Sequence, residues 1–462
     1  MNLILILTFC FSSFLSIDSG NSSPVRDAQH NANLGVNDVE TGDYQWVYNT
    51  SWAVDGGSVQ LLQMRDMVID DANNVYITGM VKTGTTSNDD AFIVKFDQNG
   101  QEVWNATFDG GHYDKGYGIA LDGSNGVYIA GETANSSDYN WNAFIAKYDN
   151  DGNYFWNITW DGISGGSDSA RDIILDDSGA IYIAGKTENT EDDVFIAKYD
   201  TSQNLVWNTT WDGGNSEKAY GIALDTSNNI YITGDVWTDH ADLLLAKFNS
   251  TGHEKWNITL DGGYGSDYSG NGIALDSSNN IYIAGSIENN TNYDSFLVAK
   301  FDNDGNQEWN YTWDGGSGDD EALDLTIGES NNVYAVGETA LSASNYDVII
   351  KKIDNSGIEK WNITYNGGWT DTCGNAIKLD AEENIYIAGD YNGQNDAFIA
   401  KYQEIIPDEN PINEENPDDD GDTTSPNAAA IPGYSFPIFM TLLSLILLGL
   451  GVKRNQHLKT HH

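Results

Sequence analysis

The sequence has little positive charge. It contains 21 Lys+Arg residues against 70 Asp+Glu residues, which gives a formal net charge of −49. A nucleic acid would be repelled by such a surface, and no cluster of basic residues is present to displace its counterions. We therefore exclude nucleic-acid binding. The acidic composition is typical of an extracellular or salt-adapted surface, and cation binding is the alternative interpretation.

Cysteine is also scarce. Of the two cysteines, Cys10 lies in an N-terminal apolar segment that we expect to be removed, so Cys373 is left alone. We therefore expect no intramolecular disulfide, and stability must come from packing.

Motifs of catalytic chemistry are missing too. The chain has no G-x-S-x-G box, P-loop or dinucleotide-binding fingerprint, and its seven histidines form no ligand pattern. We predict no catalytic residue and no cofactor-binding residue, and we do not expect an enzyme.

What the chain does contain is one unit repeated seven times, and its clearest copy runs from Gly272 to Gly316. A YIAG-like run begins at Tyr76, Tyr128, Tyr182, Tyr231, Tyr282, Tyr334 and Tyr386. A FIAKY-like run carries its lysine at Lys95, Lys147, Lys198, Lys247, Lys300, Lys352 and Lys401. The period of about 50 residues is typical of a four-stranded propeller blade.

Each run within the unit has the composition of a β-strand. The runs are rich in β-branched and aromatic residues and are bounded by Asn, Asp, Ser and Gly. In WNITW, alternation places Trp156, Ile158 and Trp160 on one face of the strand. No helical periodicity is present between residues 44 and 405, so this region is predicted to be all-β.

The ends of the array indicate a closed ring. The array opens with a Trp-type strand, residues 46–52, that has no preceding blade, and it ends at Phe398 to Tyr402 without a following Trp strand. A linear array would expose both edges, whereas a ring in which the first strand completes the last blade would not. We predict a seven-bladed β-propeller over residues 44–405.

The order of the motifs within the unit resembles that of the SBBP-type β-propeller repeats of secreted prokaryotic proteins. The motifs are GIALD, N-x-Y-I-A-G, D-A-F-I-A-K-Y-D and W-N-x-T-W-D-G-G. The resemblance covers residues 44 to about 402 and implies a propeller outside the cytoplasm. The family implies no general catalytic assignment.

The two ends of the chain predict export and anchoring. Residues 1–20 are apolar and then polar, as in a signal peptide, and residues 21–43 are predicted to be a flexible lead-in. Residues 406–430 form an acidic, proline-rich stalk. Residues 434–452 carry no charge over a length that suits a transmembrane helix, and Lys453 and Arg454 begin a cytoplasmic tail, residues 453–462.

The segment from Ile431 through the apolar span to the basic end also resembles archaeal C-terminal sorting signals of the PGF type. Tyr434 stands where that motif has Phe, so removal of the tail by a sortase-like enzyme is left open. We expect a monomeric, single-pass cell-surface protein with the propeller outside.

The Trp strand of every unit contains an N-x-S/T sequon. These sequons begin at Asn49, Asn105, Asn157, Asn208, Asn257, Asn310 and Asn362. They predict glycosylation around the rim of the ring. The alternative is that Asn and Thr simply form the polar face of an edge strand.

Acidic residues recur in the loops that follow the DGG turns. They are Asp114, Asp168, Glu217, Asp267, Asp320 and Asp371. Such residues could ring the mouth of the channel and suit a hard cation such as calcium. The alternative is that they are solvated or turn-forming residues.

Three functions follow from these observations. The first is a binding or structural module at the cell surface, with a surface glycan or a protein as its ligand and the membrane as its anchor. The second is an extracellular enzyme that acts on polysaccharide, which would need non-repeated Arg, Tyr, His or acid residues on one face. The third is a quinone-dependent oxidoreductase, because G-x-x-x-W partly resembles a docking motif of those propellers. We expect that this motif docks neighbouring blades.

Overall fold

The computed structural model describes residues 44–52, 61–82, 88–134, 140–162, 165–261, 268–288, 293–316, 318–342, 345–365, 371–391 and 396–404. The chain divides into two units, Met1–Ile406 and Pro407–His462, and every described residue lies in the first. The predicted signal peptide, lead-in, stalk, membrane helix and tail lie outside the described residues. Within the described part, no helix has the length and hydropathy that crossing a membrane requires.

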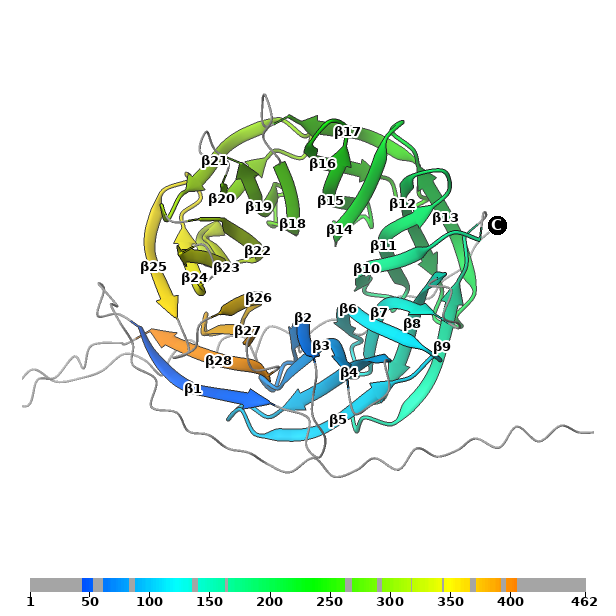
Figure 1. The fold of residues 1–462 in the computed structure, drawn as a ribbon, viewed down its shortest axis with the longest axis horizontal. Coiled ribbons are helices and arrows are strands. Elements are labelled where there is room, and N and C mark those ends of the chain that lie inside the picture. Colours follow the sequence, from blue (N-terminus) through cyan, green and yellow to red (C-terminus); the bar gives the residue numbers. More distant parts are fainter. Residues whose placement is uncertain are drawn as a thin grey trace, which may run out of the picture. The chain divides into compact units, whose positions relative to one another are not determined.

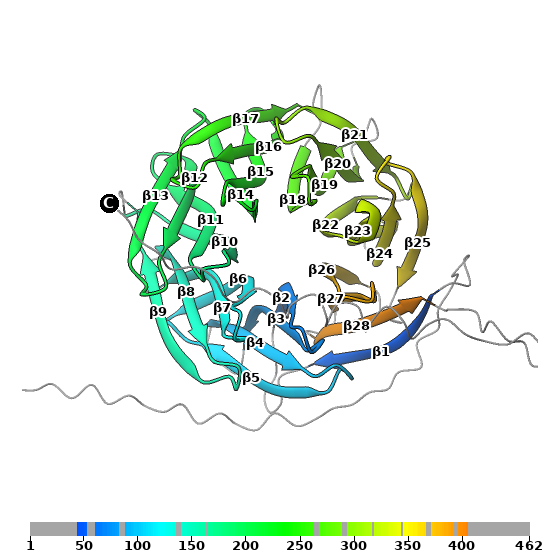
Figure 2. The ribbon, with the colours of Figure 1, turned by 180° about the vertical axis from the view of Figure 1, so that it is seen from behind.

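The described part is a ring of seven antiparallel four-stranded sheets, as the sequence predicts. Figures 1 and 2 show the sheets arranged radially, each with its first strand at the centre and its last strand at the perimeter. Among the described residues, the one helical element is a short 3-10 turn, η1 (Glu329–Asn331). The all-β, seven-bladed prediction is therefore confirmed.

The strands fall into four classes by their place in the blade. The innermost strands are β2 (Leu61–Ile69), β6 (Tyr113–Leu121), β10 (Asp168–Leu175), β14 (Ser216–Leu224), β18 (Tyr268–Leu275), β22 (Asp320–Ile327) and β26 (Thr372–Leu379). The second strands are β3 (Val75–Lys82), β7 (Val127–Ala134), β11 (Ile181–Glu188), β15 (Ile230–Trp237), β19 (Ile281–Glu288), β23 (Val333–Ser342) and β27 (Ile385–Tyr391). The third strands are β4 (Asp89–Phe96), β8 (Trp141–Tyr148), β12 (Asp192–Tyr199), β16 (Ala241–Phe248), β20 (Asp294–Phe301), β24 (Asn345–Ile353) and β28 (Asp396–Glu404). The outermost strands are β5 (Glu102–Phe108), β9 (Tyr154–Trp160), β13 (Leu205–Trp211), β17 (Glu254–Leu260), β21 (Gln307–Trp313), β25 (Glu359–Tyr365) and β1 (Tyr44–Trp52).

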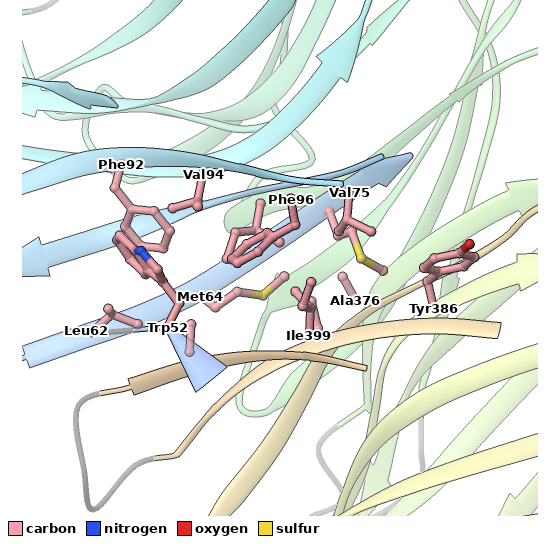
Figure 3. Close-up of a cluster of buried hydrophobic side chains, with 14 of the residues drawn as sticks. Trp52, Leu62, Met64, Val75, Phe92, Val94, Phe96, Ala376, Tyr386 and Ile399 are labelled. Atoms are coloured by element: carbon pink, nitrogen blue, oxygen red, sulfur yellow. The ribbon is translucent and has the colours of Figure 1, made fainter. Parts of the chain in front are cut away.

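The ring is closed by the first strand of the chain. β1 pairs antiparallel with β28, so the seventh sheet has the order β1-β28-β27-β26. Trp52 is buried, and its ring centroid lies 5.0 Å from that of Phe92 in the first blade. Figure 3 shows Trp52, Phe92 and Ile399 in one hydrophobic cluster, although they come from opposite ends of the array. The predicted closure is confirmed.

Acidic turns join the first two strands of each blade. In the fifth blade, Asp276 Oδ1 accepts hydrogen bonds from the backbone nitrogens of Ser278 at 2.8 Å and Asn280 at 2.9 Å. Asn279 has a φ of 62°, a left-handed conformation that asparagine tolerates. This local chemistry explains why the sequence forms a hairpin here.

Neighbouring blades are joined by a polar contact on the hairpin between the third and outermost strands. Asn150 of the second blade accepts hydrogen bonds from Tyr76 at 2.9 Å and Lys95 at 2.6 Å, both in the first blade. Its carbonyl oxygen accepts a bond from Trp104 Nε1 at 2.9 Å. Gly152 has a φ of 82°, and a Cβ there would lie 2.7 Å from Trp104. These contacts support the interpretation of G-x-x-x-W as a blade-docking motif.

Candidate functional site

Each innermost strand contains a β-bulge at the same position. In all seven pairings of first and second strands the register skips one residue of the innermost strand. We call the extra residues the inner bulge residues: Arg65, Tyr117, Arg171, Tyr220, Asn271, Leu323 and Asn375. This position changes its chemistry from blade to blade.

The glycine that ends each YIAG-like run makes the bulge fit. In the third blade, a Cβ at Gly185 would lie 1.9 Å from the carbonyl oxygen of Ser169 on the bulged strand. The same approach, between 1.8 and 2.0 Å, recurs at Gly79, Gly131, Gly234, Gly285, Gly337 and Gly389. No side chain can be accommodated at that distance, so glycine here marks a close approach of two backbones.

All seven inner bulge residues line one cavity at the centre of the ring, with a volume of about 660 Å³. A cavity of this size suits a small-molecule or saccharide ligand. Its position follows from the arrangement in Figure 1, where every innermost strand faces the centre. The chain has four arginines, and two of them, Arg65 and Arg171, lie here.

The two arginines approach one tyrosine. The guanidinium carbon of Arg171 lies 4.1 Å from the ring centroid of Tyr117, and that of Arg65 lies 6.0 Å from it. Tyr117 donates a hydrogen bond to Glu132 at 2.9 Å, and Lys115 pairs with the same carboxylate at 2.9 Å. Arg171 Nη2 is 3.8 Å from Glu132, and its Nε is buried without a hydrogen-bond partner among the described residues. The Arg171 side chain is 24% exposed, so its terminal nitrogens, and not the enclosed Nε, are the groups that could meet a ligand.

The tyrosines at this site stay protonated at neutral pH. Burial raises the pKa of Tyr117 and of Tyr220 above the ordinary range of a phenol. The Tyr220 hydroxyl donates a hydrogen bond to Asp235 at 2.8 Å, as the Tyr117 hydroxyl does to Glu132. These hydroxyls are thus poorly suited to act as general bases.

Two asparagines of the cavity wall bind carboxylates that are not among the residues lining the cavity. Asn271 donates a hydrogen bond to Glu321 at 2.9 Å, and Asn375 donates one to Asp390 at 2.8 Å. Burial raises the pKa of Glu321 to about 7 and that of Asp390 to about 6. The charged residues that line the cavity itself are of both signs: Arg65, Arg171, Lys378, Asp66, Asp172 and Asp324.

Three aspartates that follow inner bulge residues join each blade to the next one. Their carboxylates accept hydrogen bonds from backbone nitrogens of the following blade: Asp66 from Ile119 at 2.9 Å, Asp172 from Ile222 at 2.9 Å and Asp324 from Ile377 at 3.0 Å. Lys378 also donates to Asp324 at 2.8 Å. Burial raises the pKa of Asp66 to about 6 and that of Asp172 to about 8. Their bonding indicates a structural role.

The acids predicted for the channel mouth lie elsewhere. Asp114, Asp168, Glu217 and Asp320 are buried near the starts of innermost strands, and they are not among the residues that line the cavity. Each accepts a backbone hydrogen bond from the preceding turn, for example Asp168 from Gly162 at 2.6 Å and Glu217 from Asn215 at 2.9 Å. For these four residues the expected location was wrong. Cation binding itself stays a prediction.

Two other predicted acids are displaced by one residue. Tyr268 and Thr372 occupy the strand positions equivalent to Asp168, as their pairing with the second strands shows. Asp267 lies outside the described residues, and Asp371 accepts a hydrogen bond from the Tyr346 nitrogen at 3.1 Å.

The predicted glycosylation sites lie on the outermost strands. Asn157, Asn208, Asn257, Asn310 and Asn362 are exposed. Asn49 and Asn105 are half-buried, and Asn105 donates a hydrogen bond to Glu102 at 2.6 Å. Glycosylation stays a prediction at all seven sites.

Comparisons with known proteins give no family and only distant structural similarity. No protein-family profile and no curated protein sequence matches the chain. An ulvan lyase of polysaccharide lyase family PL25, bound to -[GlcA(1-4)Rha3S]-, is similar with a TM-score of 0.49 and 11% identity, over 76% of this chain and 95% of that chain. Sqt1 from Chaetomium thermophilum is similar with a TM-score of 0.42 and 7% identity, over 73% of this chain and 95% of that one. At such identities the similarity concerns the fold alone. The assignment to SBBP-type repeats stays a prediction.

Proposed function

We propose that this protein is a binding module of the cell surface, and that it takes an acidic saccharide into the central cavity. The observation that carries the proposal is the convergence of the inner bulge residues, which differ between blades, on one cavity of about 660 Å³. A closed ring of nearly identical blades would need no such differences for its stability.

The residue types at the cavity favour an anionic ligand rich in hydroxyl groups. A guanidinium matches the planar geometry of a carboxylate or sulfate, and the Arg171 side chain, which is 24% exposed, lines the cavity. The amide nitrogens of Asn271 and Asn375 each donate to two protein acceptors, so their side-chain carbonyl oxygens are the groups that can accept hydrogen bonds from sugar hydroxyls. The placement is notable in a chain of net charge −49, because a random surface position would seldom offer two arginines.

The competing function is an enzyme that acts on polysaccharide. The convergence of Arg, Tyr and Asn residues is the feature such an enzyme would require, so this alternative is stronger than the sequence suggested. Binding is favoured because the hydroxyls of Tyr117 and Tyr220 are already bonded to carboxylates, and because Asp172 accepts a backbone hydrogen bond from the next blade. The cavity offers donors but no free base among these groups.

The test is calorimetric titration of the full-length protein with uronic-acid oligosaccharides and with neutral glucose oligosaccharides of equal length. We expect binding of the acidic series only, and a loss of about tenfold in affinity for Arg171→Gln, which corresponds to one charged hydrogen bond. Lys360→Gln, an exposed change on the perimeter, is the matched control and should bind normally. Equal affinity for both series, or an unaffected Arg171→Gln variant, contradicts the proposal. Shortening of the oligosaccharide during the titration would favour the enzyme.

Export and membrane anchoring belong to the same proposal. They are supported by the apolar segment of residues 1–20 and by the uncharged segment of residues 434–452. Fractionation of cells that express the full chain, followed by protease treatment of intact cells, tests them. The proposal requires membrane association and cleavage of the propeller from outside.

A further inference from the structure

Three carboxylates meet where the third and fourth blades join. Asp193 is the second residue of β12, Asp212 follows β13 directly, and Glu217 is the second residue of β14. Each offers one oxygen, and these oxygens lie within 4.8 Å of one another. The equivalent residues at the junction of the first and second blades form a group within the same limit: Asp90, Asp109 and Asp114. We call these two groups the acidic trios.

Within the described residues, no ion pair joins a basic side chain to a carboxylate of either trio. The two adjacent acids at the start of β12 differ in their partners. Asp192 lies 3.0 Å from Lys186 and 3.8 Å from Lys218, whereas Asp193 forms no ion pair within the described ranges. The two lysines thus pair with Asp192, beside the trio, and not with the trio itself.

The trio at Glu217 also contains a buried oxygen that lacks a donor. Glu217 is 0% exposed; its Oε1 accepts a hydrogen bond from Asn215 at 2.9 Å, and its Oε2 has no partner in the described part of the chain. Asp114 is likewise 0% exposed; its Oδ2 accepts from Gly110 at 2.7 Å, and the Thr133 hydroxyl is a further partner of its carboxylate. A buried carboxylate oxygen without a donor is costly, which points to a positively charged ligand.

The pKa values agree with this arrangement. Burial together with the neighbouring carboxylates raises the pKa of Asp90 to about 6. Burial raises the pKa of Asp114 to about 6 as well, and the pKa of Asp193 and Glu217 shifts upward for the same reasons. A bound cation would reverse these shifts by stabilising the ionised forms.

The turn geometry does not account for the trios. Asp168 and Asp320 accept the same kind of turn hydrogen bond at their junctions, where Asn142 and Ser295 replace the third-strand acid. The turn therefore needs one acid and not three. At the junction of the fourth and fifth blades, Tyr268 replaces the buried acid.

We propose that the two acidic trios are binding sites for a divalent cation of the calcium type, which clamps adjacent blades. Such a cation takes carboxylate, carbonyl and water oxygens in flexible geometry, and each trio supplies three carboxylates. One clamp joins the start of β12 and the turn after β13 to β14, and the other joins the start of β4 and the turn after β5 to β6. The proposal does not depend on the ligand of the central cavity.

Terbium luminescence tests the proposal, because Tb³⁺ replaces Ca²⁺ and is excited through nearby tryptophan. Trp211 directly precedes Asp212 and serves as the donor. Full-length protein treated with chelator is titrated with Tb³⁺, the emission is displaced with Ca²⁺, and the bound Ca²⁺ is counted by equilibrium dialysis. We expect two sites per chain and saturable emission that Ca²⁺ abolishes.

Three variants sharpen the result. Asp193→Asn should lose one site and most of the Trp-sensitised emission. Asn142→Asp should gain a third site, because Asp161 and Asp168 already stand at the equivalent positions. Asp242→Asn is the matched control at a junction that lacks the buried acid, and it should still bind two ions.

The absence of saturable, Ca²⁺-displaceable emission from the wild-type protein overturns the proposal. So does an unchanged count of sites in folded Asp193→Asn. If Asp193→Asn does not fold, Asn142→Asp decides: a third site supports the clamp, and a count of two or fewer contradicts it.

Discussion

The propeller contains two rings of bulges that have opposite surroundings. The inner bulge residues converge on the central cavity. A second bulge lies in every blade where the third strand pairs with the outermost one, and its extra residues, the outer bulge residues, are Val47, Val103, Phe155, Val206, Lys255, Glu308 and Lys360. All of these are exposed to solvent.

Both rings vary between blades, but only the inner one brings its variation together. Arg171, Tyr117 and Arg65 contact one another across blade boundaries. Phe155, at 63% exposure, and Val206, at 53%, lie on separate blades at the perimeter. Variation alone is therefore a weak sign of a site, whereas variation that converges on a cavity is a strong one.

The largest effect is expected where the inner bulge meets its glycine. Gly185→Ala would place a Cβ 1.9 Å from the Ser169 carbonyl oxygen, so the strands of the third blade must separate. We expect a loss of roughly 3 kcal/mol or more in the free energy of unfolding, measured by urea denaturation. Gly123→Ala, where no atom lies within 4 Å, is the control and should change stability by less than about 0.5 kcal/mol. Similar costs at the two positions would show that the close approach is not real.

The pH dependence of stability should also separate the two rings. Because the pKa of Asp66 is raised to about 6 and that of Asp172 to about 8, the folded state holds protons that the unfolded state has released above about pH 4. The free energy of unfolding should therefore fall as the pH rises from about 5 to about 9, by an amount on the order of 3 kcal/mol.

Aspartates at the perimeter should make stability depend on pH in the opposite direction. Hydrogen bonds from Asn153 and Asn204 lower the pKa of Asp149 and Asp200 in the outer hairpin turns. Their contribution is present above the ordinary carboxyl pKa and is lost as the pH falls below about 4. Urea midpoints measured across pH should show a maximum on the acidic side of neutrality, and Asp172→Ala should flatten the decline at higher pH. A midpoint that rises steadily from pH 5 to 8 would contradict the assignment.

A smaller effect is expected for the contact that joins blades near the perimeter. Asn150→Ala removes the acceptor shared by Tyr76 and Lys95 and should cost about 1 to 2 kcal/mol in the free energy of unfolding. Thr201 stands at the equivalent place in the next blade, and there Lys147 pairs with Asp122 of its own blade at 2.9 Å. Thr201→Ala should consequently cost much less. If urea denaturation gave the same loss of stability for Asn150→Ala and Thr201→Ala, Asn150 would not stabilise the contact between blades.

The ring itself was predictable from the sequence because its signals are local and repeated. The hairpin turn at Asp276, the alternation in WNITW and the unpaired first strand all behave as predicted: Trp156, Ile158 and Trp160 are half-buried, and the residues between them are exposed. Each of these features depends on a few neighbouring residues, so one copy of the unit is enough to recognise it.

The candidate site was not predicted, because it depends on register. A bulge shifts the strand pairing by one residue, and no residue type in the innermost strand identifies which residue is left unpaired by the bulge. The signal that could have located it was the glycine of the YIAG-like run, since a glycine within a strand often faces a bulge.

The smallest effect is expected at the outer ring. Phe155→Ser changes a side chain that is 63% exposed, so we expect a change of less than about 0.5 kcal/mol in the free energy of unfolding. In the same blade, Tyr117→Ser removes the ring under Arg171 and the hydrogen bond to Glu132, and it should cost about 2 kcal/mol or more. Both substitutions replace an aromatic bulge residue by serine, so urea denaturation compares the two positions directly. If the two costs were equal, the inner bulge would be as loosely held as the outer one, and the cavity would lose the ordered walls that a ligand requires.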